Sequence, residues 1–437
     1  MLEKTPPLAG KLMNSNYSRT VLTNGLRVLT IPMEGLSSAT VLVLIGAGSR
    51  YEEADKAGLS HFVEHMIFKG TKKRPTAFDI SSLVDSVGGE NNAFTGKDQT
   101  GFYIKIQKDR LALAFDILSD TLRDSLYLEE EIEREKGPII EEINMYEDNP
   151  LYKIDDVFYE LIFDGNPLGW STAGEKKTVK SIKRDDFLNY VKRFYQGSDM
   201  VLAVAGNVNA EEVEKLAEEY FSSFDKGQKE KFIKFEENQT KPQIKIAYKK
   251  TDQAHIYFGF PAFSFFDPDR YALEVLSAIL GGGMSSRLFI QVRERRGLAY
   301  YVRADNDTYH ETGLFAARAG LNLEKVEEAV KVILDEFYKT KNGDITEKEL
   351  SKSKEFLKGR TMLGLESSRR VAEWYAEKEL MENQIETPAE LLKNIEKVTL
   401  ADVNRVAKRI FKPEKANLAV IGPFEDKEKL LNIISGK

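Results

Sequence analysis

The order of predicted strands and helices occurs twice along this chain, and this repeat limits the fold more than any other feature. In the first half, apolar stretches at 19–23 and 27–32 flank Asn24-Gly25, a dipeptide typical of β-hairpins. Further apolar stretches predict strands at 39–49, 90–95, 100–107 and 200–206. Helical periodicity predicts helices at 57–68, 76–87, 109–124, 128–148, 152–163, 184–195 and 210–223.

The second half follows the same order. Strand-like sequences at 244–250 and 254–262 precede a helix from Asp269, strands at 299–307 and 312–319, and helices at 323–340 and 346–365. A late strand, NLAVIGPF at 417–424, is similar to MVLAVAGNV at 200–208. We therefore predict an α+β fold made of two homologous units of roughly 200 residues each.

A charged stretch between the two halves has the composition of a linker. It reads DKGQKEKFIKFEENQTKPQ, lacks periodicity and ends at a proline-containing turn signal. We predict a first unit at 1–225, a linker at 226–242 and a second unit at 243–437.

The composition excludes several classes of function. The 437 residues include 63 lysines and arginines against 70 acidic residues, and this net charge of −7 argues against nucleic acid as a partner. Without cysteine there are no disulfides, thiolate metal ligands or cysteine nucleophiles. No apolar run reaches the roughly 18 residues of a membrane span, and residues 1–10 lack the apolar core of a signal peptide. We expect a cytoplasmic protein with no membrane partner.

Two of the four histidines stand in an H-x-x-E-H motif. His61 and His65 are four residues apart in a predicted helix, so both imidazoles face one side and can reach one metal ion. Glu64 lies beside them, where a carboxylate can take a proton from water. This order is the inverted form of the zinc-peptidase motif H-E-x-x-H, found in inverzincins. The alternative is two histidines that share a helix face by chance.

A zinc site needs a third protein ligand, and the acidic helix at 128–150 offers candidates. Glu135 and Glu142 are seven residues apart and therefore share a helix face. Spacing alone leaves Glu141 open as the ligand. An acidic helix of this kind is also compatible with a solvated surface element.

These motifs together resemble the pitrilysin-type zinc peptidases. That family includes insulin-degrading enzyme, the β-subunit of the mitochondrial processing peptidase and single-subunit bacterial processing proteases. The similarity starts with GLSHFVEHMIFKGTKKR and continues in GGENNAFT, IIEEI, NPLGWSTAG and GGGMSSRLFIQVRERRGLAY. It covers nearly the whole chain from about residue 17.

The resemblance implies a role for each motif residue of the first half. His61 and His65 match the two imidazole ligands of one zinc ion per chain, and Glu64 matches the general base. Glu142 matches the distal glutamate ligand, and Glu135 matches an auxiliary glutamate one face-repeat earlier.

One feature of the acidic helix departs from the family pattern. Gly137-Pro138 stands between the two glutamates, and a proline inside a helix removes a backbone hydrogen bond. We therefore expect a kink that interrupts the helix between Glu135 and Glu142.

The second half lacks the zinc motif but carries Arg293 and Tyr300, which match an Arg/Tyr pair that the family uses at the substrate. The resemblance implies two units, each a mostly antiparallel sheet covered by helices, that pair into a clamshell. It further implies a homodimer whose active sites are shared between chains, or alternatively a heterodimer with a related subunit.

The family resemblance also implies the substrate. Asn92, Ala93, Phe94 and Thr95 match a strand to which an extended peptide adds by backbone hydrogen bonding. We therefore expect a zinc-dependent endopeptidase that hydrolyses unfolded or targeting-type peptides in a closed chamber. Two alternatives are a non-catalytic partner subunit or peptide-binding scaffold of the same family, and a metal-dependent hydrolase of another substrate class.

Overall fold

A computed structural model describes residues 17–436 of the chain. They form two compact units, and neither unit is continuous in sequence. Unit 1 contains residues up to 143 together with 171–233 and 361–390, and unit 2 contains 144–170, 234–360 and the residues from 391 onwards. The prediction that no signal peptide is present concerns residues 1–10, which lie outside the described residues.

Unit 1 is built on a six-stranded sheet. Its strands are β1 (Ser18–Val21), β2 (Arg27–Pro32), β3 (Ser38–Ile45), β4 (Glu90–Thr95), β5 (Thr100–Gln107) and β6 (Met200–Gly206). They lie in the order β1-β2-β6-β3-β5-β4, and only β2 and β6 are parallel neighbours. The predicted hairpin joins β1 to β2, where Gly25 takes the positive φ of +86° that a tight turn requires.

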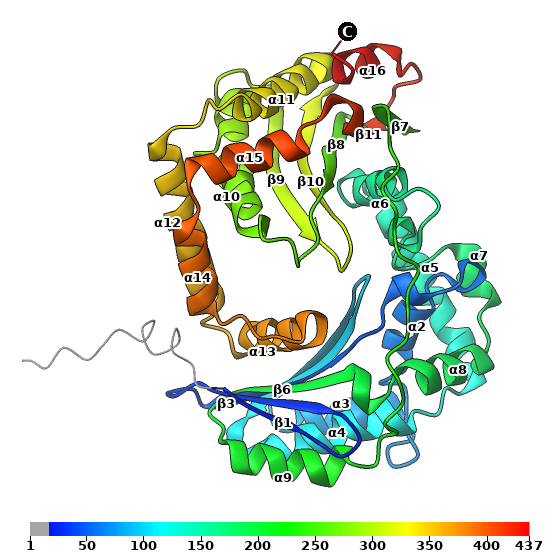
Figure 1. Cartoon of the computed structure of the whole chain (residues 1–437). Helices are drawn as coiled ribbons and strands as arrows, with labels where there is room; N and C mark the ends of the chain where they lie inside the picture. The colour runs from blue at the N-terminus through cyan, green and yellow to red at the C-terminus, as the bar shows by residue number, and fades with distance from the viewer. Residues whose placement is uncertain (1–16, 437) are drawn as a thin grey trace, which may run out of the picture. The chain divides into compact units, whose positions relative to one another are not determined.

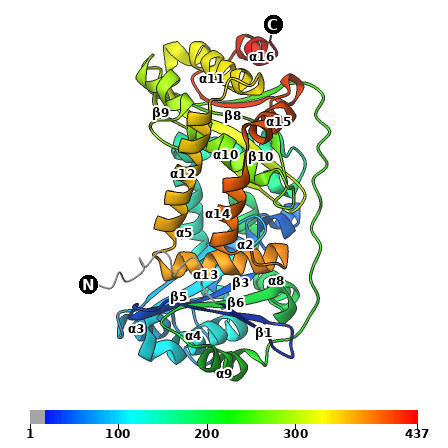
Figure 2. The same cartoon turned by 60° about the vertical axis from the view of Figure 1, so that its left-hand side comes forward.

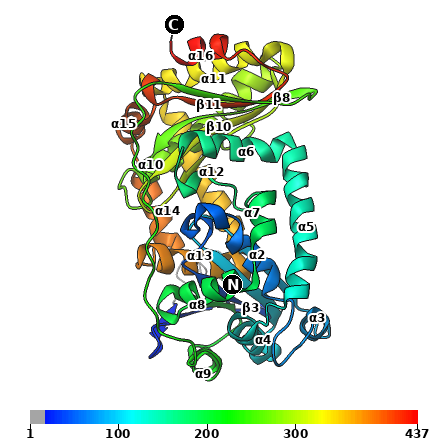
Figure 3. The ribbon, with the colours of Figure 1, turned by 90° about the vertical axis from the view of Figure 1, so that its right-hand side faces the viewer.

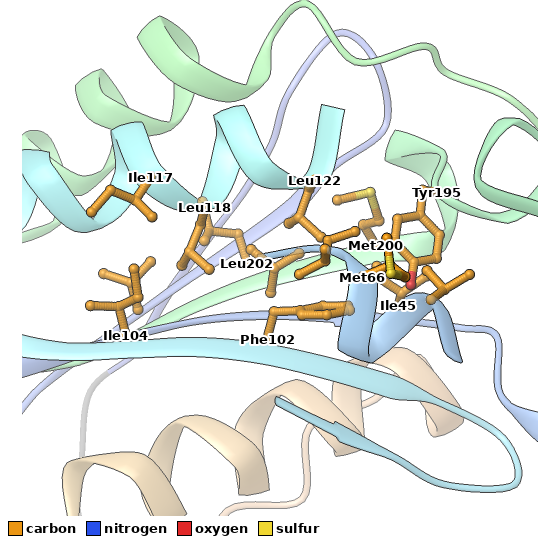
Figure 4. Close-up of a cluster of buried hydrophobic side chains, with 14 of the residues drawn as sticks. Ile45, Met66, Phe102, Ile104, Ile117, Leu118, Leu122, Tyr195, Met200 and Leu202 are labelled. Carbon is orange, nitrogen blue, oxygen red and sulfur yellow. The ribbon is translucent and has the colours of Figure 1, made fainter. Parts of the chain in front are cut away.

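Helices cover both faces of this sheet (Figure 2). The helices of unit 1 on one face are α2 (Leu59–Met66), α3 (Ala77–Asp85), α4 (Leu111–Asp124), α7 (Lys176–Ser181), α8 (Arg184–Phe194), α9 (Ala210–Phe221) and the first part of α5 (Glu129–Asp148). Figure 4 shows how α4 fills this core against the sheet, with Ile117, Leu118 and Leu122 above Phe102, Ile104 and Leu202.

The other face of the sheet is covered by α13 (Ser368–Glu377), which comes from the second half of the sequence. Ala372 and Tyr375 of α13 belong to the same buried cluster as Leu42 and Leu44 of β3. Because β3 is buried on both faces, its sequence is a continuous apolar run rather than an alternating one.

Unit 2 is built on a five-stranded sheet (Figure 1). Its strands are β7 (Gln243–Tyr248), β8 (Gln253–Ala262), β9 (Ala299–Thr308), β10 (Gly313–Asn322) and β11 (Asn417–Gly422). They lie in the order β7-β11-β8-β10-β9, with β7 and β11 parallel. Subtracting five from each label gives 2-6-3-5-4, the order in unit 1 without β1. The prediction of two α+β units with mostly antiparallel sheets is therefore confirmed.

Helices cover both faces of the second sheet as well. The helices of unit 2 are α6 (Pro150–Ile162), α10 (Arg270–Gly281), α11 (Val326–Lys341), α15 (Leu400–Ile410) and α16 (Glu428–Ile434), while α12 (Glu347–Gly364) and α14 (Pro388–Lys397) have residues in both units. On one face, Phe158 of α6 packs edge-on against Tyr257, with ring centroids 4.1 Å apart. On the other, Phe258 packs against Phe337 of α11 at 5.5 Å.

Each compact unit therefore contains one covering helix that comes from the other half of the sequence. Helix α6 lies in the first half of the sequence but packs in unit 2, and α13 lies in the second half but packs in unit 1. Residues 226–240 contain no helix or strand. The boundaries predicted at 225 and 243 divide the chain by repeat rather than by packing, and they stay a prediction.

The acidic helix is continuous, contrary to the expected interruption. Helix α5 runs from Glu129 to Asp148 through Pro138 and appears as one helix in Figure 3. Gly137, Pro138 and Arg134 are exposed, so water can bind the Arg134 carbonyl that loses its partner. Ile132 and Ile139 hold the opposite face of the helix in the core. Helix α5 is therefore not interrupted between Glu135 and Glu142, and the predicted kink stays a prediction.

Among residues 17–436, no helix is long and apolar enough to span a lipid bilayer.

Candidate metal centre

Helix α2 presents the histidines because its other side is buried in unit 1. Leu59, Phe62, Val63 and Met66 belong to the core, and Phe62 packs edge-on against Phe187 with ring centroids 4.9 Å apart. This apolar stripe leaves His61, Glu64 and His65 on the remaining face of the helix, where each side chain is only partly buried.

The start of α2 is fixed by a buried carboxylate. Glu52 accepts hydrogen bonds from the backbone N–H of Gly58 at 2.7 Å, from that of Ser60 at 2.6 Å and from the Ser60 hydroxyl. Gly58 has a φ of +96°, and a Cβ there would lie 2.7 Å from the Ala173 carbonyl oxygen. Burial raises the pKa of Glu52 to about 7 against these hydrogen bonds. No sequence pattern had indicated this residue.

Three ligand atoms converge beside α2. The Nε2 atom of His61 lies 3.6 Å from Oε2 of Glu142, and Nε2 of His65 lies 3.4 Å from the same oxygen. All three atoms lie within 4.8 Å of one another. Ligand atoms about 2.1 Å from a tetrahedral zinc ion are about 3.4 Å apart, so the spacing and the donor types fit zinc.

The structure distinguishes Glu142 from Glu141, the two glutamates that spacing left as candidate ligands. Glu142 faces the histidines and is partly buried, whereas Glu141 is exposed on another side of α5. Residues one apart in a helix point about 100° from each other, so only one of the two can face α2.

Glu135 contacts the second ring nitrogen of His65, Nδ1. Its Oε1 atom lies 3.0 Å from Nδ1 of His65, and its Oε2 atom forms an ion pair with Lys69. A hydrogen bond from Nδ1–H fixes the tautomer that leaves Nε2 of His65 directed at the metal position. Burial alone would raise the pKa of Glu135, but its hydrogen bonds to His65 and Lys69 hold that pKa below its usual value. Lys69, four residues after His65, was a residue that spacing could have indicated.

The two histidines differ in their electrostatic surroundings. Burial and the neighbouring His65 lower the pKa of His61 to about 4, so this imidazole is neutral and can act as a ligand. For His65, burial is outweighed by the hydrogen bonds to Glu135 and Glu142, which raise its pKa to about 9, so a metal ion at Nε2 would have to displace the proton held there. Among the described residues, the buried Nδ1 atom of His61 has no hydrogen-bond partner.

Glu64 lies beside the ligands and has a different partner. The hydroxyl of Thr95, the last residue of β4, donates a hydrogen bond to Oε2 of Glu64 at 2.5 Å. Burial raises the pKa of Glu64, and the Thr95 hydrogen bond acts in the opposite direction. A carboxylate with a raised pKa takes up a proton more readily.

Strand β4 is the edge of the first sheet, and no strand among residues 17–436 pairs with its outer side. The N–H of Gly96 donates to the Gln99 carbonyl at 2.8 Å, which makes these two a hydrogen-bonded pair. Because such pairs alternate along antiparallel strands, Thr95 and Ala93 point their backbone groups away from β5. The Ala93 N–H is bonded to the side-chain oxygen of Asn92 at 2.8 Å.

Arg293 and Tyr300 belong to unit 2. Arg293 lies in the helical turn η6 (Phe289–Glu294) and Tyr300 in β9, where its side chain is 73% exposed. The guanidinium carbon lies 5.7 Å from the Tyr300 ring centroid and 4.9 Å from that of Phe289. The structure brings these two residues together, and the unit 1 cluster forms without them.

The chain contains two copies of one α+β unit, and the first copy brings two imidazoles and a distal glutamate together. This combination defines the class of two-unit proteins with the inverted zinc-peptidase motif. Residues 27–176 match the family model described as Insulinase (Peptidase family M16), and residues 181–357 match the one described as Peptidase M16 inactive domain. The chain belongs to peptidase family M16, which confirms the resemblance to the pitrilysin-type peptidases.

Relatives and solved structures agree over nearly the whole chain. An uncharacterized zinc protease of Streptomyces coelicolor is 35% identical over 94% of this chain and 90% of its own length. The uncharacterized zinc protease YmxG of Bacillus subtilis is 34% identical over 92% of this chain and 97% of its own. A protease from Helicobacter pylori superposes with a TM-score of 0.88 at 26% identity, covering 94% of this chain and 100% of that one.

A peptidase M16 inactive domain from Pseudomonas fluorescens superposes with a TM-score of 0.86, covering 94% of this chain and 99% of that one. At 18% identity this match bears on the fold alone.

Proposed function

We propose that this protein is a zinc-dependent endopeptidase that hydrolyses unfolded peptides. The observation that carries the proposal is the convergence of one atom each from His61, His65 and Glu142, with Glu64 beside them. The relatives named zinc proteases, at 34–35% identity over more than nine-tenths of the chain, support the same reaction.

One zinc ion per chain would be held by these three side chains. When bound, zinc acts as a Lewis acid that polarises a carbonyl and makes water a better nucleophile at neutral pH. Glu64 takes a proton from the water molecule as the water oxygen attacks the peptide carbonyl carbon. The same carboxyl then gives that proton to the leaving nitrogen as the C–N bond breaks, so Glu64 returns to its starting state.

The open edge of β4 supports a peptide as the substrate. An extended peptide that adds to Asn92, Ala93, Phe94 and Thr95 would bond through backbone groups, which every peptide has. Its carbonyl would replace the Asn92 side chain at the Ala93 N–H. Because these bonds do not depend on side chains, they give register without a strict sequence preference.

Arg293 and Tyr300 complete the proposed site from the second unit. The Tyr300 hydroxyl would donate a hydrogen bond to the carbonyl oxygen under attack, and Arg293 would hold the substrate backbone. We propose that these residues reach the zinc centre of a partner chain in a homodimer, with a heterodimer as the alternative. The units would close around the peptide like a clamshell.

A non-catalytic subunit or peptide-binding scaffold is the second candidate. It is favoured by the match of residues 181–357 to a family described as inactive. That match covers the repeat without the zinc motif, however, while residues 27–176 hold an intact set of ligands and base. The open edge strand argues against a hydrolase of another substrate class.

Metal analysis and digestion of an unstructured peptide library separate these candidates. We expect about one zinc per chain, peptide cleavage by the native protein, and zinc without cleavage in Glu64→Gln. Bound zinc without turnover in the native protein would indicate a scaffold. Turnover of esters or phosphates but not peptides would indicate another hydrolase.

A further inference from the structure

Thr95 joins the open sheet edge to the proposed general base. It ends β4, is paired across the hairpin with Thr100, and points its own backbone groups away from β5. Its backbone N–H and C=O therefore face the side where a peptide would add.

The side chain of the same residue points to α2. Side chains alternate between the two faces of a strand, so Thr95 shares a face with Ala93, which packs against the core that contains α2. The Thr95 hydroxyl donates to Oε2 of Glu64 at 2.5 Å, the short distance expected for an O–H bonded to a carboxylate.

This bond is the only side-chain hydrogen bond that Glu64 forms among the described residues. Glu64 has several rotatable bonds, and a general base must meet its proton within hydrogen-bond reach. A fixed hydroxyl on one carboxylate oxygen leaves the other oxygen, Oε1, for the water. The neighbouring ligand His65 has Glu135 for the same purpose.

We propose that Thr95 is a positioning residue that orients Glu64 and links the docking of a peptide strand to the readiness of the base. A peptide that adds to the β4 edge bonds to the backbone of Thr95, and this fixes the residue whose hydroxyl holds the carboxylate. The inference rests on the proposed endopeptidase function and adds a residue to its machinery.

The test compares Thr95→Val, which has the same shape without the hydroxyl, with Thr95→Ser, which keeps the hydroxyl. We expect kcat to fall about ten- to a hundredfold in Thr95→Val while KM changes less than threefold, the loss that follows from removing a hydrogen bond to a charged group. Thr95→Ser should restore most of kcat. Zinc content and the affinity of the zinc-free protein for a peptide should equal those of the native protein.

Thr100→Val is the matched control. Thr100 lies opposite Thr95, but its hydroxyl donates to the Ala47 carbonyl at 2.8 Å instead of to Glu64. We expect this variant to unfold at a lower temperature and to keep its kcat. A fall in kcat equal to that of Thr95→Val would mean that the hairpin, rather than the bond to Glu64, matters.

A double-mutant cycle separates positioning from a structural role. In the Glu64→Gln background, Thr95→Val should bring almost no further loss, because the group through which it acts has been removed. Additive losses would overturn the inference, and so would a native kcat in Thr95→Val, while both results leave the proposed function intact. Absence of peptide cleavage by the native zinc-loaded protein would overturn both.

Discussion

At the residue scale, Glu64 is expected to contribute to chemistry and not to metal binding. Its carboxylate bonds to Thr95, whereas the proposed ligand set consists of His61, His65 and Glu142. Glu64→Gln should therefore keep zinc and fold while turnover falls at least roughly a thousandfold. Metal analysis, circular dichroism and peptide cleavage measure the three properties. Loss of zinc from this variant would show that the roles are misassigned.

The distal ligand can be tested with adjacent residues of one helix. Glu142→Gln should weaken zinc binding at least about tenfold, because an amide oxygen without charge replaces the carboxylate oxygen that lies within 3.6 Å of the Nε2 atoms of both histidines. Glu141→Gln is the matched control and should bind zinc like the native protein, since Glu141 is exposed. Competition with a coloured chelator measures both affinities. The reverse result would move the ligand by one position.

The sequence could predict the residues of the site whose relation is local. His61, Glu64 and His65 lie within five positions of one helix, so helical geometry places them together. Glu142 was preferred to Glu141 only through the family resemblance, because spacing in the acidic helix left both open. Glu52 and the Thr95–Glu64 bond depend on segments brought together by folding. No periodicity within one segment carries that information.

At the scale of elements, the anchor of α2 predicts a pH-dependent stability. Burial raises the pKa of Glu52 from 4.5 in the unfolded chain to about 7 in the fold. The folded state therefore holds a proton that the unfolded chain releases, so this contribution is fully present below about pH 4.5 and is lost as pH rises to 7. Native protein should lose about 2 kcal/mol of unfolding free energy relative to Glu52→Gln between pH 5 and pH 8.

Urea unfolding of both proteins at the two pH values measures this difference. Because the amide introduced by Glu52→Gln does not titrate, every other titrating group cancels in the comparison. An advantage of the native protein that grows with pH would show that the hydrogen bonds from Gly58 and Ser60 outweigh burial, so that the carboxyl is ionised throughout.

Elements differed in how far the sequence could define them. The strands and the long helices have strong apolar periods, and their predicted bounds agree with the observed strands β1 to β11 and with the observed long helices within a few residues. The helices α13, α14 and α15 received no predicted bounds. A helical stripe shows that a face is buried but not which sheet covers it, so the packing of α13 on β3 could not be predicted.

At the scale of the whole molecule, the two units contain complementary parts of the proposed site. Unit 1 has the proposed zinc ligands and Glu64, whereas Arg293 and Tyr300 pair with each other in unit 2. The repeat explains this division, since both sheets have the same strand order but only the first copy has the motif.

The last prediction concerns how the two parts meet. In a homodimer with shared sites, the Tyr300 of one chain completes the zinc centre of its partner, and the two sites are equivalent by twofold symmetry. Glu64→Gln and Tyr300→Phe chains should each be nearly inactive alone. Mixing them by dissociation and reassembly gives heterodimers in which one site has both defects and the other has neither. Activity should then return to about half of the native value per mixed dimer.

If each site lies within one chain, every site keeps one defect and mixing restores nothing. A monomer in sedimentation experiments that still cleaves peptides would also contradict sharing, because no partner would be present to supply Tyr300.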